Sequence, residues 1–196
     1  MTNTRHHGNR HGRSEQARQA VLEAADDILV ERGFAGVTVE GIAARAGVAK
    51  QTIYRWWPSK IDILLDAFVA DMNEELTPPD LGSLTDDLAA YLPMLATFLT
   101  ETDQGAVLRA LAGQAQHDPA MATRFRDECV LPLRARDRSL LERAIARSEL
   151  PAELDLDSAI DQLVGPIYYR VLVTGEPITR EFTDSLIRDF LAMMRR

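Results

Sequence analysis

The sequence is poor in cysteine and lysine, and it has no long apolar run. With a single cysteine, Cys129, the chain cannot form an intramolecular disulfide, which is typical of a reducing compartment. No apolar stretch approaches the ~20 residues that a membrane-spanning helix needs. The polar, His- and Arg-rich N-terminus also lacks the apolar core of a secretory signal. We therefore expect a cytoplasmic protein without a membrane partner.

The distribution of charge is more informative than its total. The 196 residues carry a formal net charge of −8, which by itself disfavours a nucleic-acid partner. Residues 1–60, however, hold nine basic and six acidic residues, a charge of +3, and they include both lysines, Lys50 and Lys60. The rest of the chain carries −11. This asymmetry indicates a polyanion-binding end on an acidic body, although blocks of this size also differ by a few charges by chance.

Apolar residues recur at helical spacing along most of the chain, and no segment alternates with the period of a strand. This spacing, with a cap at Ser14 and a break at Gly47, predicts an all-α fold of about nine helices. The expected helices are 15–32, 39–46, 49–56, 60–75, 84–100, 104–116, 119–148, 157–174 and 179–194. Pro132 and Pro166 lie inside two of them and should kink or split them.

Residues 38–57 hold two short helices joined by a tight turn, the arrangement of a helix-turn-helix whose second helix enters the DNA major groove. Lysine and arginine on that helix suit guanine, glutamine suits adenine, and hydroxyl groups suit bases or phosphates. Thr38 and Lys60, each at a helix start, suit phosphates. The candidate DNA-contacting residues are Thr38, Arg45, Lys50, Gln51, Thr52, Tyr54, Arg55, Trp56 and Lys60. Helical hairpins with a glycine turn are also common in protein cores, so the pattern alone leaves that alternative open.

Residues 14–75 resemble the N-terminal domain of the TetR family of transcriptional regulators. The matching positions are Gly33-Phe34, Val37-Thr38-Val39, Ile42-Ala43, Ala46-Gly47-Val48, Ile53-Tyr54, Pro58-Ser59-Lys60 and Leu64. The resemblance implies that Tyr54 and Lys60 contact phosphates and that Trp57 is an aromatic core residue. The adjacent Trp56 should then face outward, either near the DNA backbone or against helix 60–75.

The resemblance continues into the C-terminal part, which looks like one subgroup of TetR ligand-binding domains. The matching segments are Leu81-Gly82-Ser83-Leu84, Gln116-His117-Asp118-Pro119, Gly165-Pro166-Ile167-Tyr168-Tyr169 and Thr174-Gly175-Glu176-Pro177. This likeness implies the fold and dimerisation, but no particular ligand. We therefore expect a disordered basic arm at 1–13, a DNA-binding domain at 14–75 and a ligand-binding and dimerisation domain at 76–196. The arginines of the arm could follow the DNA backbone or enter the minor groove, or they add only nonspecific attraction.

Two C-terminal helices are candidates for a dimer interface. The helix 157–174 is apolar on nearly all sides, which indicates burial on both sides, and the helix 179–194 adds an apolar stripe. The residues expected at a two-fold interface are Ile160, Val164, Ile167, Val171, Phe182, Leu186, Phe190 and Met194. The alternative is an ordinary core within one subunit, and the family resemblance favours the dimer.

Large apolar side chains of the C-terminal part are candidates for lining a ligand cavity, with three polar side chains that could orient a ligand. These candidates are Tyr91, Met94, Leu95, Phe98, Leu108, Leu111, Gln114, His117, Phe125, Tyr168 and Arg170. Most such residues form ordinary core, because a sequence does not show packing defects. No nucleophile elbow, metal-ligand spacing or phosphate-binding glycine loop is present in the sequence. We therefore expect no catalytic residue, metal or cofactor.

Together these features predict a homodimeric regulator that binds a palindromic operator in double-stranded DNA. The family resemblance implies that it is a repressor and that a small-molecule effector releases it, and the residues permit this mechanism. A DNA-binding regulator controlled by a protein partner is the alternative, and a small helical enzyme is a remote one.

Overall fold

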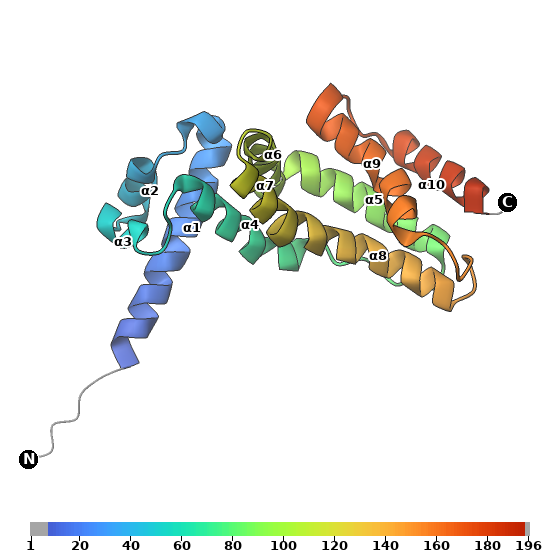
Figure 1. Ribbon diagram of the computed structural model, residues 1–196, viewed down its shortest axis with the longest axis horizontal. Helices are drawn as coiled ribbons and strands as arrows, with labels where there is room; N and C mark the ends of the chain where they lie inside the picture. The colour runs from blue at the N-terminus through green and yellow to red at the C-terminus, as the bar shows by residue number, and fades with distance from the viewer. Residues whose placement is uncertain (1–7, 195–196) are drawn as a thin grey trace, which may run out of the picture. The chain divides into compact units, whose positions relative to one another are not determined.

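The computed structural model describes residues 8–194, and the side chains within that range except those of 8–13 and 70–75 (Figure 1). Every regular element in that range is a helix, so the expected all-α fold is confirmed. None of these helices is both long and apolar enough to cross a membrane. The chain divides into two compact units, Met1–Ala70 and Asp71–Arg196. The domain boundary expected between residues 75 and 76 remains a prediction.

The first unit holds three helices and the beginning of a fourth. They are α1 (Gly8–Gly36), α2 (Val39–Ala46), α3 (Lys50–Tyr54) and α4 (Lys60–Glu75). Because α1 begins at Gly8 rather than after Ser14, the expectation of a disordered arm is wrong for residues 8–13, while residues 1–7 lie outside the described range. Extending an existing helix by about two turns needs no new nucleus, which accounts for the earlier start. Helical geometry in α1 is interrupted at Gly33, where φ is 66°.

The helices of this unit pack around one apolar core. Its members, each at most 3% exposed, include Val21, Ala25, Ile28, Ile42, Ile53, Trp57, Leu64 and Phe68. Helices of eight and five residues are not stable alone in water. Burial against α1 and α4 is therefore what keeps α2 and α3 folded.

The second unit contains six more α-helices and two π-helical turns. They are α5 (Leu84–Glu101), α6 (Asp103–Ala115), α7 (Pro119–Phe125), η1 (Arg126–Val130), α8 (Leu131–Ala146), α9 (Leu156–Tyr169), η2 (Arg170–Thr174) and α10 (Arg180–Met194). The turn η1 joins α7 to α8 without a gap, and η2 continues α9. Counted as uninterrupted stretches, the described residues therefore form nine helices, the number expected.

The two prolines that were expected to kink or split helices, Pro132 and Pro166, do not end them. Pro132 follows η1 by two residues, and Pro166 precedes η2 by four. In both π-helical turns a backbone N–H reaches five residues back, from Leu131 to the Arg126 carbonyl and from Gly175 to the Arg170 carbonyl. A wider turn close to each proline redistributes the backbone hydrogen bonds that a proline disrupts.

Helix α5 lies at the centre of the second unit and contacts α6, α8 and α10 (Figure 1). The contact with α6 depends on Gly105 near the start of that helix. A Cβ at this position would lie 2.1 Å from the carbonyl oxygen of Phe98 and 2.8 Å from that of Leu99. Only glycine therefore allows the two helices to approach this closely.

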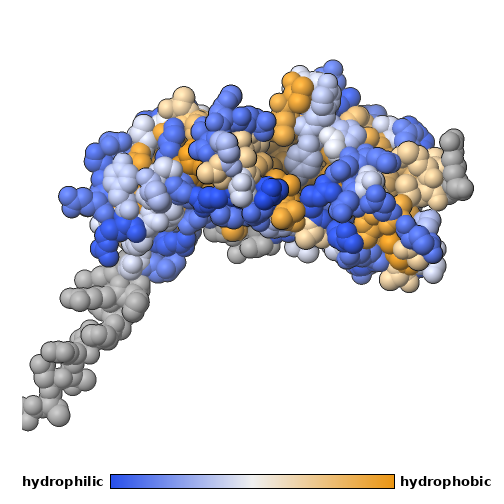
Figure 2. Space-filling model, in the orientation of Figure 1, coloured by the Kyte–Doolittle hydropathy of each residue, from blue (hydrophilic) through white to orange (hydrophobic). Residues whose placement is uncertain are grey.

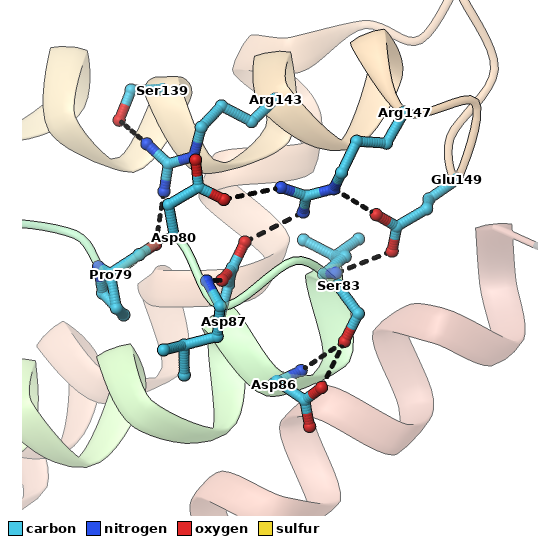
Figure 3. Close-up of polar contacts among 11 residues, drawn as sticks. Pro79, Asp80, Ser83, Asp86, Asp87, Ser139, Arg143, Arg147 and Glu149 are labelled. Carbon is cyan, nitrogen blue, oxygen red and sulfur yellow. Dashed lines mark hydrogen bonds and ion pairs between the residues drawn. The ribbon is translucent and has the colours of Figure 1, made fainter.

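A network of charged residues, which we call the clasp, ties the segment before α5 to the end of α8 (Figure 3). The clasp consists of Asp80, Asp87, Arg147 and Glu149. Arg147 pairs through Nη2 with Asp87 (2.9 Å), through Nη1 with Asp80 (3.0 Å) and through Nε with Glu149 (2.5 Å). The Asp87 side chain is fully buried, so its charge depends on Arg147 for compensation.

The clasp also satisfies backbone groups around the start of α5. Asp87 Oδ1 accepts a hydrogen bond from the N–H of Leu81 at 2.6 Å, and Glu149 Oε2 accepts one from Leu84 at 2.6 Å. The first N–H groups of a helix have no acceptor within the helix. The bond from Leu84 and the nearby Arg147 hold the pKa of the Glu149 carboxyl below its usual value. Residues 80–84 are thereby held against the end of α8.

Removing the central arginine should destabilise the fold. We expect Arg147→Ala to lower the free energy of unfolding by about 3 kcal/mol, because Asp87 is left buried without its counter-charge. Denaturant-induced unfolding followed by circular dichroism measures this loss.

The matched control is Arg138→Ala on the same helix. Arg138 pairs with Glu142 at 2.8 Å on the exposed surface, so its removal should change the free energy of unfolding by less than about 1 kcal/mol. Equal losses in the two variants would contradict the role given to the clasp.

Candidate DNA-reading surface and internal cavity

The turn between α2 and α3 is fixed by a cap at each end of α2. The Thr38 hydroxyl accepts a hydrogen bond from the Gly41 N–H at 3.0 Å. At the other end Gly47 adopts a φ of 66°, and its N–H donates to the Ala43 carbonyl. This left-handed residue ends α2 and allows α3 to start at Lys50. Thr38 remains exposed, although its hydroxyl oxygen already serves the helix cap.

Two buried side chains orient α3. Ile53 is fully buried, and Trp57 is 3% exposed, as expected for the aromatic core position. Trp57 Nε1 donates to Asp66 Oδ2 at 2.8 Å, and Arg18 of α1 donates to the same oxygen at 2.7 Å. These contacts join α1, the end of α3 and α4, so the opposite face of α3 is turned to solvent.

The solvent face of α3 presents a dense set of polar groups. Lys50, Gln51, Tyr54 and Arg55 are exposed, and Thr52 is half-buried. Ammonium, amide, hydroxyl and guanidinium groups therefore lie within six residues of one another along the chain. These are the groups that proteins use to contact base edges and phosphates.

Trp56 lies beside this face and is half-buried. Its ring meets that of Trp57 edge to face, with the ring centroids 5.4 Å apart and the planes at 79°. Of the two positions expected for Trp56, this contact favours partial packing, with the remaining surface of the ring open to solvent.

Two candidate cations are paired with acidic residues of the same unit. Lys50 Nζ lies 2.8 Å from Glu40 Oε1, and this hydrogen bond holds the pKa of Glu40 below its usual value and that of Lys50 above it. Arg45 lies 2.6 Å from Glu31 and 3.6 Å from Asp27 on α1. A DNA phosphate has to compete with these carboxylates for both cations.

Lys60 at the start of α4 is partly committed to the fold. Its Nζ donates to the carbonyl oxygens of Phe34 (3.0 Å) and Val37 (2.9 Å), and it lies 4.2 Å from the centre of the Phe34 ring. Partial burial lowers the pKa of this ammonium group. An ammonium has three N–H donors, so one donor remains for a phosphate.

The second unit contains a cavity of about 190 Å³ lined by residues of α6, α7, η1, α8, α9 and η2. The residues lining it are Leu108, Ala112, Phe125, Val130, Leu133, Arg134, Asp137, Asp161, Val164, Gly165, Tyr168 and Leu172. Three predicted pocket residues, Leu108, Phe125 and Tyr168, are among them. The cavity is therefore mostly apolar, with charged side chains from α8 and α9.

The other predicted pocket residues lie elsewhere. Tyr91, Leu95 and Leu111 are buried core, and Met94 and Phe98 line a separate hollow beside Pro93. Three polar candidates remain: Gln114, His117 and Arg170. Gln114 is half-buried, and His117 is exposed. Arg170 donates to the carbonyl of Pro177 and stacks on the ring of Phe182, 3.6 Å from the ring centre.

Sequence reasoning missed the charged residues of the cavity, above all Asp137. This side chain is 3% exposed, and its Oδ1 accepts a hydrogen bond from the Tyr91 hydroxyl at 2.7 Å. Burial raises the pKa of Asp137 to about 6, while Tyr91, Arg134 and Arg136 act in the opposite direction. The signal was an acidic residue in the middle of the apolar stripe of α8, where a solvated carboxylate has no place.

The residues expected at the dimer interface fall into two groups. Those already buried in the core of the single chain are Ile160, Val164, Ile167 and Phe190. Those half-buried are Val171, Phe182, Leu186 and Met194. The first group faces the same unit, because the helical stripe that carries it is covered by neighbouring helices.

Other apolar residues of the same helices remain exposed. They are Tyr169 (58%), Leu172 (48%), Val173 (67%) and Met193 (47%), which we call the apolar patch. Figure 2 shows hydrophobic atoms gathered over the end of α9 that continues into η2. A two-fold interface on these helices would have to use this patch and the half-buried group.

Two family models match the chain and together cover most of it. Residues 21–67 match the bacterial regulatory proteins of the tetR family, and residues 78–190 match the tetracyclin repressor-like C-terminal domain.

Known proteins are similar to this chain over nearly its whole length. YdeS of Bacillus subtilis (strain 168), an uncharacterised HTH-type transcriptional regulator, is 40% identical over 179 residues, which cover 91% of this chain and 88% of YdeS. The DNA-binding transcriptional repressor TetR of Mycobacteroides abscessus is 30% identical over 190 residues, which cover 94% of this chain and 96% of that protein. The crystal structure of the TetR family transcription regulator SCO0332 has a TM-score of 0.77 at 33% identity and covers 90% of this chain and 97% of its own.

The buried carboxyl of Asp137 should make stability depend on pH. Because the pKa is higher in the folded than in the unfolded chain, the favourable contribution of the protonated group is complete below about pH 4 and is lost as the pH rises through about 6. We expect the free energy of unfolding of the wild type, relative to Asp137→Asn, to fall between about pH 4 and about pH 7.5. Denaturant titrations of both proteins at each pH measure this difference.

Tyr91→Phe provides the matched comparison. It removes the hydrogen bond that lowers the pKa of Asp137 in the folded chain, so the fall should begin at the same pH and continue to a higher pH. Parallel pH profiles for the wild type and Asp137→Asn would contradict the assignment.

Proposed function

The chain belongs to the TetR family of bacterial transcriptional regulators, and we propose that it acts as a homodimeric repressor that a small molecule releases from a palindromic operator. Its relatives are DNA-binding regulators rather than enzymes. The observation that carries the proposal is the solvent face of α3, where Lys50, Gln51, Tyr54 and Arg55 project from a helix anchored by Ile53.

In the proposed complex α3 enters the major groove. Lys50 and Arg55 contact guanine edges, Gln51 contacts adenine, and Tyr54 and the remaining donor of Lys60 contact phosphates. Two copies of α3 read half-sites about 34–36 Å apart, or a multiple of that distance. Acting on chromosomal DNA, the protein works in the cytoplasm.

The apolar patch supports the dimer. Tyr169, Leu172 and Val173 are large apolar residues that lie within five positions and face solvent. A partner that repeats the same helices would cover them in a two-fold, four-helix arrangement. The residues at the centre of the interface are then those of the patch, with Phe182 and Leu186 beside them.

The cavity supports regulation by a small molecule. A ligand that binds one conformation of the dimer more tightly shifts the population toward it. If that conformation holds the two α3 helices at the wrong spacing, DNA is released. The alternative, control by a protein partner alone, would follow from a cavity too small for a ligand. About 190 Å³ is more than the ~150 Å³ cavity that binds benzene.

Substitutions on α3 test the reading face. We expect Lys50→Ala and Arg55→Ala each to weaken binding to the DNA upstream of the protein's own gene about tenfold, and to reduce the preference for it over unrelated DNA. Fluorescence anisotropy at several salt concentrations measures both effects. Arg138→Ala, which removes an exposed arginine of the second unit, serves as the control. Wild-type affinity in both α3 variants would show that another surface reads the DNA.

A charge in the apolar patch tests the dimer. Val173→Asp should shift the protein from dimer to monomer at micromolar concentration, because it places an unpaired carboxylate in the interface. Sedimentation velocity measures the shift. Val30→Asp, at a residue that is 50% exposed on α1, should leave the dimer intact, and a Val173→Asp protein that remains dimeric would refute this interface.

A further inference from the structure

We propose that the small molecule bound by the second unit is a compact, largely apolar amine whose ammonium group pairs with the Asp137 carboxylate. The inference rests on the proposed function in one respect, namely that the cavity is the effector site. It is carried by three observations: the size of the cavity, its apolar walls and the state of its charged groups.

The size of the cavity limits the ligand to about one ring. Pockets for drug-sized ligands have volumes of about 300–1,000 Å³, whereas this cavity has about 190 Å³. A cavity of ~150 Å³ holds benzene. A single ring with a short side chain therefore fits, and a long acyl chain does not.

The walls of the cavity supply apolar contacts. The apolar lining residues are Leu108, Ala112, Phe125, Val130, Leu133, Val164, Tyr168 and Leu172. Phe125 precedes η1 and Val130 is its last residue, while Tyr168 lies in α9 two residues before η2 and Leu172 lies within η2. Single π-helical turns are frequent at functional sites. Because most of the lining residues are apolar, the part of the ligand that they contact should be a hydrocarbon.

Two of the three charged groups of the lining neutralise each other. Arg134 Nη1 pairs with Asp161 Oδ1, and Arg134 Nη2 lies 3.3 Å from Asp157 Oδ1. The side chain of Asp161 is 67% exposed, so this pair lies at the solvent side of the cavity. Neither group is available as the counter-ion of a buried ligand.

Asp137 is the charged group left without such a partner. The part of the chain that the structure describes gives its carboxylate a hydrogen bond from Tyr91 but no ion pair. Tyr168 and Asp161 of α9 line the same cavity, and Arg134 and Arg136 carry positive charge on the helix of Asp137. A hydroxyl donor satisfies one oxygen and adds no charge.

The sign of the charge on the ligand follows from this arrangement. Burying a carboxylate away from water is energetically unfavourable unless a positively charged group pairs with it. An ammonium group supplies that charge and up to three hydrogen-bond donors. A neutral hydrocarbon leaves the carboxylate unpaired, and an anion is repelled. Of these classes, the cavity favours the amine.

Leu172 connects this site with the proposed dimer interface. It lines the cavity and also belongs to the apolar patch, being 48% exposed. A ligand that moves η2 therefore also alters the surface that the second copy would cover.

Three one-ring probes test the proposal with the full chain. They are 2-phenylethylamine, 2-phenylethanol and phenylacetate, which differ mainly in charge. At neutral pH we expect calorimetry to give the amine at least about tenfold tighter binding than the acid, with the alcohol in between. Asp137→Asn keeps an oxygen that can accept the hydrogen bond from Tyr91. This variant should bind the amine about tenfold more weakly than the wild type and bind the alcohol with an affinity within about threefold of the wild type.

A second variant locates the binding site. Ala112→Phe fills the cavity and should abolish binding of the amine and the alcohol alike. The proposal is overturned if the acid binds as tightly as the amine, if no probe binds, or if Asp137→Asn keeps the preference for the amine.

DNA binding, measured in parallel, separates this proposal from the proposed function. If the protein binds its upstream DNA but no amine, the proposed function as a regulator stands and the proposal of an amine ligand is refuted. A protein that binds the amine through Asp137 but is not released from DNA supports the site and refutes its role as the effector site.

Discussion

A helix of five residues is not stable alone in water, and the surface proposed to read DNA lies on such a helix, α3. The conformation of α3 is set by the core beneath it, through Ile53 and Trp57. One oxygen of Asp66 accepts hydrogen bonds from Trp57 and Arg18, so α1, the end of α3 and α4 share one polar anchor at the edge of the apolar core. Affinity for DNA and stability of the first unit are therefore coupled, because the side chains that face outward are positioned by those that face inward.

Local sequence patterns predicted the helices well, but they did not predict contacts between residues that are far apart in the sequence. Thr38 and Gly47 mark the ends of α2 because capping needs specific side chains or a positive φ at those positions. The partners of Lys60 could not be predicted, since they lie 23 and 26 residues away. Helical periodicity also identified Ile160 as buried without showing whether its own subunit or a partner covers it. The cavity was predicted only in part, because a void is a property of packing that no residue type encodes.

Among the side chains that the structure describes, two buried carboxylates of the second unit, Asp87 and Asp137, are compensated in different ways. Asp87 has a guanidinium partner and a backbone N–H, and it holds a segment of chain in place. Asp137 has one hydroxyl partner and lines an open space. A buried charge that is fully compensated contributes to structure, whereas one that is compensated only in part has an energetic reason to accept a ligand.

The clasp also limits where the sequence of this chain can be joined to that of a relative in a chimaeric protein. Residues 80–84 look like a linker, and Gly82, with its φ of 92°, is the obvious place to join two parents. A chimaera joined there would take Asp80 from one parent and Arg147 from the other, splitting the network between two lineages. A junction before Pro78 keeps the network in one parent. The first units of such relatives could then be exchanged while the second unit, together with the segment before α5, is kept whole.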